Sequence, residues 1–128
     1  MKDSVVMDKS YAFALRIIKA YKFLCEEKKE FVLSKQILRS GTAIGALIKE
    51  AEHAQSRPDF INKMNVALKE ANETEYWLRL IYDSDYIAKA SFESIRQDCA
   101  ELVCLLVKIV KTSKLKVKNG KLKTESEL

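Results

Sequence analysis

Apolar side chains recur every three or four residues in four long segments of the chain, a spacing typical of amphipathic helices. The first segment, about residues 8–29, aligns Tyr11, Ala14, Leu15, Ile18, Tyr21 and Cys25 on one stripe. The second, about residues 32–55, aligns Leu33, Ile37, Ile44, Ile48 and Ala51. The third, about residues 58–83, aligns Phe60, Met64, Ala67, Ala71, Thr74, Leu78 and Ile81. The fourth begins at Ser91 and aligns Phe92, Ile95, Cys99, Leu102, Leu106 and Ile109.

Polar and turn-forming residues separate these segments. Ser56 is suited to cap the third helix, with Pro58 and Asp59 in its first turn. Helices of roughly 22 to 26 residues are about 33–39 Å long, and the short connections between them force neighbours to run antiparallel. The sequence therefore predicts an all-α, antiparallel up-down-up-down four-helix bundle at residues 1–112, followed by a basic C-terminal tail at residues 113–128.

Two glycines, Gly41 and Gly45, fall inside the second helical segment, although each costs about 1 kcal/mol of helix stability relative to alanine. The stretch lacks the spacing of a phosphate-binding loop, and no strand precedes it. The apolar stripe also keeps one phase from Leu33 to Ala51, which disfavours a helix break. We therefore predict helix packing here, with a neighbouring helix passing close to both glycines.

The formal net charge of +5 lies mainly at the C-terminal end. Residues 111–128 hold two glutamates and six lysines, which are the candidate nucleic-acid contacts Lys111, Lys114, Lys116, Lys118, Lys121 and Lys123. The rest of the chain holds seventeen basic and sixteen acidic side chains, so it is close to neutral. Asn119-Gly120 between alternating lysines and apolar residues is a hairpin signal. Because two strands this short are unstable alone, we expect a frayed basic extension here rather than a hairpin.

Candidate catalytic and metal-binding residues are few. Glu50 and His53 have the Glu-x-x-His spacing of a di-iron bundle, but such a site needs two of these pairs and the chain has one histidine. Cys25, Cys99 and Cys104 form no Cys-x-x-Cys motif, so we expect buried reduced thiols rather than a disulfide or a zinc site. We therefore expect no enzymatic activity, no cofactor, no metal and no small-molecule substrate.

The apolar segments are also too short for a membrane protein. The longest uncharged apolar run is far shorter than the about 20 residues that a membrane span needs. The first ten residues lack the apolar core of a secretory signal. We therefore expect a cytoplasmic protein with no membrane partner.

The third helical segment has two unusual features. Glu75 falls within its apolar stripe, where a carboxylate needs a partner, and Lys22 of the first helix is the candidate for a buried polar pair with it. The outer side of the same segment is apolar, which favours a self-association surface. Two charged residues of the second segment also point outward. The oligomer-interface candidates are therefore Arg39, Glu50, Val66, Tyr76, Trp77 and Leu80.

Three motifs follow one another in the middle of the chain: QILRS at residues 36–40, AIGALIKEA at residues 43–51 and ALKEANETEYWL at residues 67–78. In order and spacing they resemble the bacterial four-helix-bundle family of 23S rRNA intervening sequence (S23-type) proteins. The middle motif departs from the family pattern, because Leu47 replaces the usual Asn and KEA stands where AEG is common. The resemblance implies a homopentamer with no known enzymatic activity. It also implies a relation to the accessory proteins of diversity-generating retroelements, whose pentamers engage a reverse transcriptase and nucleic acid.

Two functions are compatible with these features. The first is a homopentameric accessory protein that binds RNA or DNA, in which five tails would gather thirty lysines and bind phosphates in a salt-dependent way. The chain shows no basic groove interleaved with aromatic residues, so we predict no sequence specificity. The second is an oligomeric scaffold for a protein partner, with no nucleic-acid binding.

Overall fold

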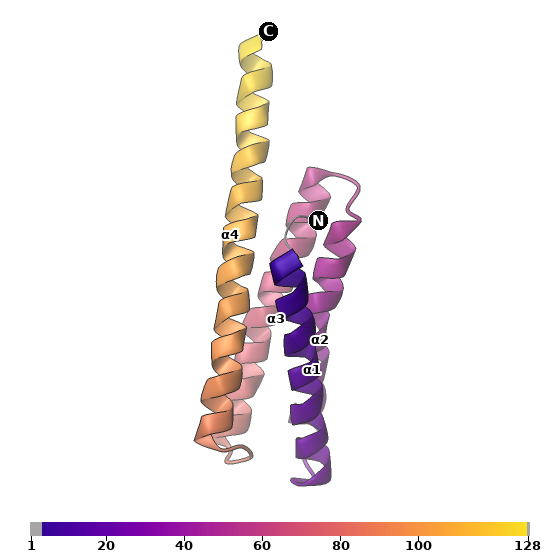
Figure 1. Cartoon of the computed structure of the whole chain (residues 1–128), viewed down its shortest axis with the longest axis vertical. Helices are drawn as coiled ribbons and strands as arrows, with labels where there is room; N and C mark the ends of the chain where they lie inside the picture. The colour runs from indigo at the N-terminus through magenta and orange to yellow at the C-terminus, as the bar shows by residue number, and fades with distance from the viewer. Residues whose placement is uncertain (1–3, 128) are drawn as a thin grey trace.

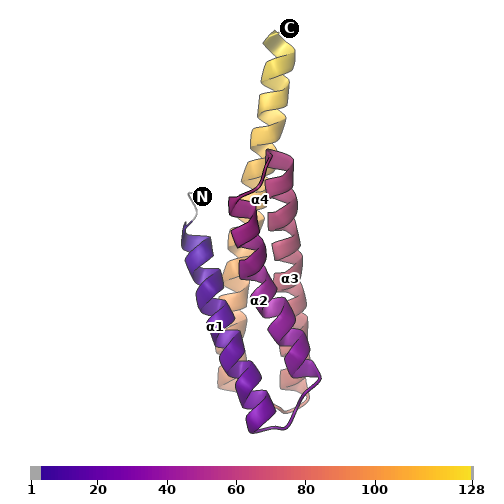
Figure 2. The same cartoon turned by 90° about the vertical axis from the view of Figure 1, so that its right-hand side faces the viewer.

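The computed structural model describes the backbone of residues 4–127 and the side chains of residues 5–120, and it confirms the all-α prediction. Four helices follow one another: α1 (Ser4–Glu26), α2 (Leu33–Glu52), α3 (Arg57–Asp83) and α4 (Lys89–Glu127). Each helix packs against the next one in the chain, and α1 closes the bundle against α4 with the smallest of the four contacts. Successive helices run in opposite directions (Figure 1, Figure 2), as an up-down-up-down bundle requires.

The start of α3 follows the sequence prediction. The Ser56 hydroxyl accepts a hydrogen bond from the backbone N–H of Asp59 at 3.2 Å, and Pro58 lies in the first turn, where its missing N–H leaves no bond unmade. At the other end of α3, Asp85 takes a positive φ of 68° as the chain turns toward α4. The cap at the start of α3 and the turn after its end set the length of this helix and the direction in which the chain enters and leaves it.

The turn between α1 and α2 depends on Glu30. The Glu30 carboxylate accepts the backbone N–H groups of Val32, Leu33 and Ser34 at 3.2, 3.1 and 2.8 Å. The Ser34 hydroxyl donates in turn to the Glu30 carbonyl oxygen at 2.8 Å. Because the residue at the N-cap position, Val32, has no side-chain oxygen, Glu30 satisfies the N–H groups at the start of α2 in its place.

The core fills the space between the helices with apolar side chains. The stripes predicted for α2, α3 and α4 are mostly buried, with Leu33, Phe60 and Ile109 only half-buried at their edges. Near the middle of the bundle, the hydroxyls of Ser40 and Thr74 are both inaccessible and form a hydrogen bond of 2.9 Å between α2 and α3. The core is therefore mainly apolar, and its buried hydroxyl groups at Ser10, Ser34, Ser40 and Thr74 are hydrogen-bonded.

The stripe predicted for α1 is wrong in phase. The side chains that α1 buries are Val6, Ser10, Phe13, Ile17 and Leu24. The predicted stripe instead faces outward, with Tyr11 68% and Leu15 47% exposed. The reason is that α1 carries two apolar stripes, and packing against α2 and α4 selects the one that contains Phe13 and Ile17.

The two glycines of α2 lie along its contact with α1. Gly41 is buried against Ile17, and Gly45 faces Ser10 one turn further along α2. α1 and α2 therefore approach each other at positions where α2 has no side chain. Neither glycine has a positive φ, so both are ordinary helical residues whose importance is steric.

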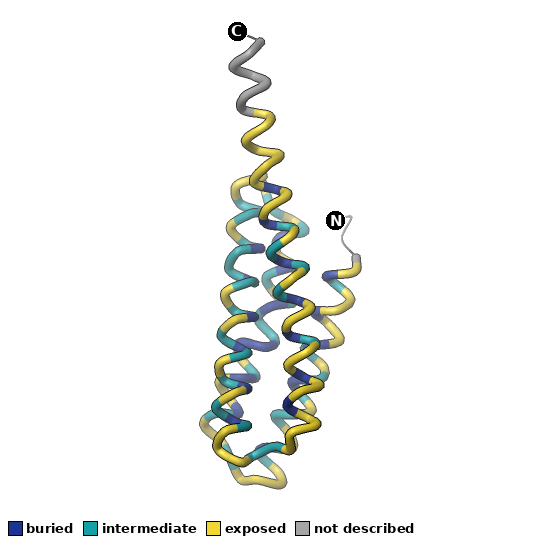
Figure 3. The backbone as a smooth tube through the Cα atoms, turned by 90° about the vertical axis from the view of Figure 1, so that its left-hand side faces the viewer, coloured by how far each residue is buried: buried dark blue, intermediate teal, exposed yellow. Residues whose placement is uncertain are grey.

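The C-terminal segment forms neither a hairpin nor a frayed extension, because α4 continues as one helix to Glu127. Ser113 is the last buried residue of α4 among the described side chains, and residues 114–120 are exposed (Figure 3). α4 thus extends well beyond the N-terminal end of α1 and past the turn between α2 and α3 (Figure 1). Asn119-Gly120 makes no turn, because a strand here would have no partner, whereas lysine and leucine favour a helix.

Candidate nucleic-acid interface

The exposed part of α4 carries a run of lysines with no acidic residue between them. No Asp or Glu occurs from residue 102 to residue 124. The lysines of this run whose side chains are described are all exposed: Lys108, Lys111, Lys114, Lys116 and Lys118. Within residues 5–120, none of the five has a carboxylate within ion-pair distance. The predicted contacts Lys121 and Lys123 lie outside the described side chains.

Four of these lysines occupy two flanks of α4. At about 100° per residue, Lys116 lies on one flank, Lys111, Lys114 and Lys118 lie on the other, and Lys108 lies on the outward side, opposite the buried face. The side of the helix between the two flanks is the one that continues the buried face of the bundle. A polyanion that contacts α4 therefore meets lysines on either side of that face.

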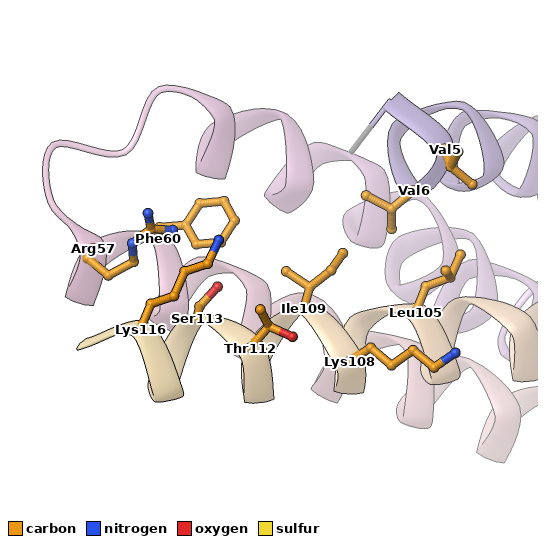
Figure 4. A pocket seen from close by; sticks show the side chains of 10 residues that line it. All are labelled: Val5, Val6, Arg57, Phe60, Leu105, Lys108, Ile109, Thr112, Ser113 and Lys116. Carbon is orange, nitrogen blue, oxygen red and sulfur yellow. The ribbon is translucent and has the colours of Figure 1, made fainter. Parts of the chain in front are cut away.

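A groove opens at the end of the bundle, where α4 runs past the first turns of α1 and α3. It has a volume of about 390 Å³, and its lining combines aliphatic, aromatic, hydroxyl and cationic side chains (Figure 4). Its aromatic, hydroxyl and cationic lining residues are Phe60, Thr112, Ser113, Arg57, Lys108 and Lys116. Among the residues that the structure describes, no acidic side chain lines it.

Two of these residues come from the start of α3 and are already in contact. The Arg57 guanidinium lies 5.6 Å from the centroid of the Phe60 ring, within the range of a cation–π interaction. Figure 4 shows Arg57, Phe60 and Lys116 toward the same end of the groove, with Lys108 toward the other end. This basic and aromatic surface was missed by the sequence prediction, because Arg57 and Phe60 lie about 50 residues before the lysines of α4.

The predicted buried pair of Glu75 and Lys22 is wrong. Glu75 instead forms an ion pair with Arg96 of α4, with 3.7 Å between its Oε1 and the arginine Nε. Lys22 is exposed on α1. α3 contacts α2 and α4 but not α1, so the two side chains were never neighbours. At 39% exposure, the Glu75 carboxylate is also not buried.

The charged interface candidates of α2 already have partners within the chain. The Arg39 guanidinium donates to Glu70 at 3.0 Å and also to Glu73, which ties α2 to α3. Glu50 lies 3.9 Å from the Lys63 ammonium, again across the contact of α2 with α3. A contact between subunits at either residue would have to compete with these pairs.

The apolar patch predicted on α3 is smaller than expected. Val66, Trp77 and Leu80 are half-buried, and Trp77 packs against the core. Tyr76 is 58% exposed and contacts Trp77 edge to face, with 5.1 Å between the ring centroids. The Trp77 indole N–H is buried and has no hydrogen-bond partner among the described residues.

The outward stripe of α1 is the larger apolar surface. Tyr11 and Leu15 are exposed on it, and Ala14 and Ile18 are half-buried beside them. A groove of about 490 Å³ lies between this stripe and α2, and its lining includes Lys49. The sequence did identify these residues as an apolar stripe, but it assigned them to the core of a single chain.

The remaining chemistry of the chain is sparse. Burial, and secondarily the negative charge of Glu75, raise the pKa of Cys99 to about 12, and its thiol donates to the Ala71 carbonyl oxygen at 3.3 Å. Cys104 is exposed, which corrects the prediction that all three thiols are buried. Among the described residues, no group of histidine, cysteine and acidic side chains could hold a metal ion. No described helix is long and apolar enough to cross a membrane.

Comparisons with known proteins agree with this architecture. Residues 2–108 match the family model of the 23S rRNA-intervening sequence protein. The chain is also similar to a crystal structure described as a protein with unknown function from the S23 ribosomal protein family of Bacteroides thetaiotaomicron VPI-5482. The identity is 64%, the TM-score is 0.85, and the match covers 87% of this chain and 99% of the other. No curated protein matches the chain. The family match ends at residue 108, before the lysines at residues 111–123.

Proposed function

The chain belongs to the 23S rRNA-intervening sequence protein family, and we propose that it is a non-enzymatic, self-assembling accessory protein that binds nucleic acid in the cytoplasm. The observation that carries this proposal is the run of exposed lysines on α4, which have no acidic partner among the described side chains. Lysines that served only solubility would be interspersed with acidic residues, as they are in the rest of the chain.

The physical basis of binding is neutralisation of phosphates. Each lysine that contacts a phosphate releases condensed counterions, so the affinity falls steeply as the salt concentration rises. The part of α4 beyond Ser113 spans about 20 Å at 1.5 Å per residue. That length matches several phosphates of a nucleic-acid strand, and a chain of exposed lysines along it favours binding that depends little on sequence.

Self-assembly multiplies this charge. The proposed oligomer is a homopentamer, in which five copies of α4 bring thirty lysines of residues 111–123 together. The outward stripe of α1 supports such an assembly, because Tyr11 and Leu15 leave more apolar surface exposed than an isolated bundle needs. The chain's motifs resemble those of a family related to the accessory proteins of diversity-generating retroelements. The proposal therefore includes a partnership with a reverse transcriptase, as those accessory proteins have.

A second candidate function is that of an oligomeric scaffold for a protein partner, with no nucleic-acid binding. Exposed apolar side chains, and not charges, favour this candidate. The α1 stripe and the exposed Tyr76 offer two separate surfaces on the bundle. One of them could serve self-association while the other meets a partner. This candidate predicts that nucleic acid does not bind even at low salt.

A charge-matched pair of variants separates the two functions. The test variant replaces three exposed lysines of α4 by glutamine: Lys111, Lys114 and Lys118. The control replaces three exposed lysines of the bundle body by glutamine: Lys19, Lys35 and Lys69. Fluorescence anisotropy with labelled RNA and duplex DNA at two salt concentrations should show weakened binding and a shallower salt dependence for the α4 variant alone. Absence of binding by the wild type at low salt would refute the nucleic-acid function.

A further inference from the structure

We propose that the groove at the end of the bundle, lined by Arg57, Phe60, Lys108 and Lys116, binds a single-stranded segment of nucleic acid. This inference rests on the proposed function and deepens it, because it names the form of the nucleic acid and the residues that select it. One base stacks in the groove beside Phe60, and the adjacent phosphates contact the cations at its rim.

The charge of the groove distinguishes it from two other hollows among the described residues. Its described lining residues include three cations and no acidic side chain. By contrast, the groove between α1 and α2 contains Asp8 as well as Lys49. The hollow between α1 and α4 contains Lys9 and Glu101, which form an ion pair of 2.9 Å. The bundle-end groove is thus complementary to an anion in a way that the other two are not.

The cations also come from two different elements and converge on the opening. Arg57 begins α3, whereas Lys108 and Lys116 lie about two turns apart along α4. All three side chains are exposed, and none has a carboxylate partner among the described residues. A phosphate at the rim would therefore displace no existing ion pair, which is not true at Arg39, Arg16 or Arg96.

The interior of the groove suits a base. Val6, Leu105 and Ile109 give it an apolar wall, and the Ser113 and Thr112 hydroxyls add polar atoms beside that wall. The Phe60 ring is half-buried and still lines the groove. Its volume of about 390 Å³ falls in the size range of small-ligand sites, large enough for a nucleobase with its sugar.

This arrangement favours a single strand over a duplex. Single-strand binding combines a cationic path for the backbone with aromatic side chains on which unpaired bases stack. The bases of a duplex are stacked on one another and present only their edges, so Phe60 would have no base face to contact. The exposed lysines on the other flank of α4 have no such aromatic neighbour, and they should bind both forms through phosphates alone.

The test uses the full chain and two fluorescein-labelled nucleic acids, decauridylate and a ten-base-pair DNA duplex. The first variant is Phe60→Leu, which keeps an apolar side chain against the core but removes the ring. Its affinity for decauridylate should fall by at least about fivefold, the lower end of the effect of removing one stacked base. Its affinity for the duplex and the salt dependence of binding should stay unchanged.

A second, charge-matched comparison covers the case in which Phe60→Leu does not fold, as judged by circular dichroism. The double variant Arg57→Gln and Lys116→Gln removes two groove cations, whereas the control Lys114→Gln and Lys118→Gln removes two cations from the other flank. We expect the groove variant to lose the preference for decauridylate over the duplex, and the control to weaken both ligands equally.

The possible outcomes distinguish a failure of the groove proposal from a failure of the proposed function. Wild-type protein that binds neither nucleic acid at low salt overturns both. Wild-type protein that binds without preferring the single strand, or groove variants that behave like the control, overturn the groove alone. Tighter binding of a labelled deca-glutamate peptide than of decauridylate would also overturn it, because the site would then recognise negative charge without a base.

Discussion

A Cβ atom placed on Gly41 of α2 would lie 2.9 Å from both Cγ1 and Cγ2 of Ile17 on α1. Ile17 is completely buried and branched at Cβ, and its own Cβ would be only 3.3 Å away, so the side chain cannot turn aside freely. Gly45, four residues later, is different. A Cβ there would have the Ser10 hydroxyl as its nearest neighbour at 3.4 Å, which is ordinary van der Waals contact.

The two glycines therefore predict opposite responses to alanine. Both substitutions gain the same helix propensity, about 1 kcal/mol, but only Gly41→Ala overpacks the core, which typically costs about 1–3 kcal/mol. We expect the free energy of unfolding of Gly41→Ala to be about 1–3 kcal/mol lower than that of Gly45→Ala. Urea titrations of both variants measure the difference. Equal stabilities would show that α1 adjusts its position at no cost.

The sequence alone was enough to predict the helices but not all of their buried faces. Helix periodicity placed α2, α3 and most of α4, because each carries one apolar stripe. It failed for α1, where Phe13 and Ile17 compete with Tyr11 and Leu15 for the inner face. Which of two stripes is buried depends on the neighbouring helices, and that information is tertiary and not local.

The cap of α2 leads to a prediction about pH. Burial raises the pKa of Glu30, but hydrogen bonds from the N–H groups of Ser34, Leu33 and Val32, in that order, lower it by more, so the pKa lies below its ordinary value. A carboxylate with a lowered folded-state pKa contributes stability above its unfolded-state pKa, and this contribution is lost as the pH falls through the folded-state pKa.

We therefore expect Glu30→Ala to reduce the free energy of unfolding by about 1 kcal/mol at neutral pH, as the loss of a helix cap typically does. The deficit relative to wild type should shrink as the pH falls below about 4.3, the ordinary pKa of glutamate. Thermal unfolding of both proteins between pH 7 and pH 3 measures it. A deficit that stays constant over this range would mean that the negative charge of Glu30 contributes nothing.

Only part of the candidate site could be predicted from the sequence. The lysines of α4 stand in one run, so counting charges found them. The groove could not be found in this way, because Phe60 and Lys116 meet only when α4 runs past the start of α3. The Glu75 pairing with Lys22 failed for the same reason, because the true partner, Arg96, could be recognised only once the neighbours of α3 were known.

Cys99 and Cys104 should differ in reactivity. Burial, together with the charge of Glu75, raises the pKa of Cys99 to about 12, so its thiolate is scarce near neutral pH. Cys104 is exposed on the opposite side of α4. We expect iodoacetamide at pH 8 to alkylate Cys104 at least about tenfold faster than Cys99, as measured by mass spectrometry of peptides. Addition of urea should equalise the two rates, and equal rates without urea would contradict the buried position of Cys99.

The last prediction concerns the surface through which copies of the chain associate. Replacing Trp77 by glutamate cannot test the α3 surface, because Trp77 packs against the core and its loss would destabilise the fold itself. Leu15 and Tyr76 are better choices, since they are 47% and 58% exposed and sit on different faces of the bundle. Both can accept a charge in the isolated chain at little cost.

If the outward stripe of α1 is the self-association surface, Leu15→Glu should raise the dissociation constant of the assembly by at least about tenfold, because it buries an unpaired charge. Tyr76→Glu should leave the assembly intact. Light scattering coupled to size exclusion compares each mass with the 14.7 kDa of a single chain. Dissociation by Tyr76→Glu alone would move the interface to α3, where the buried Trp77 N–H still needs a partner. A wild-type mass of 14.7 kDa would remove self-assembly from the proposed function and leave the lysines of α4 to act in a monomer.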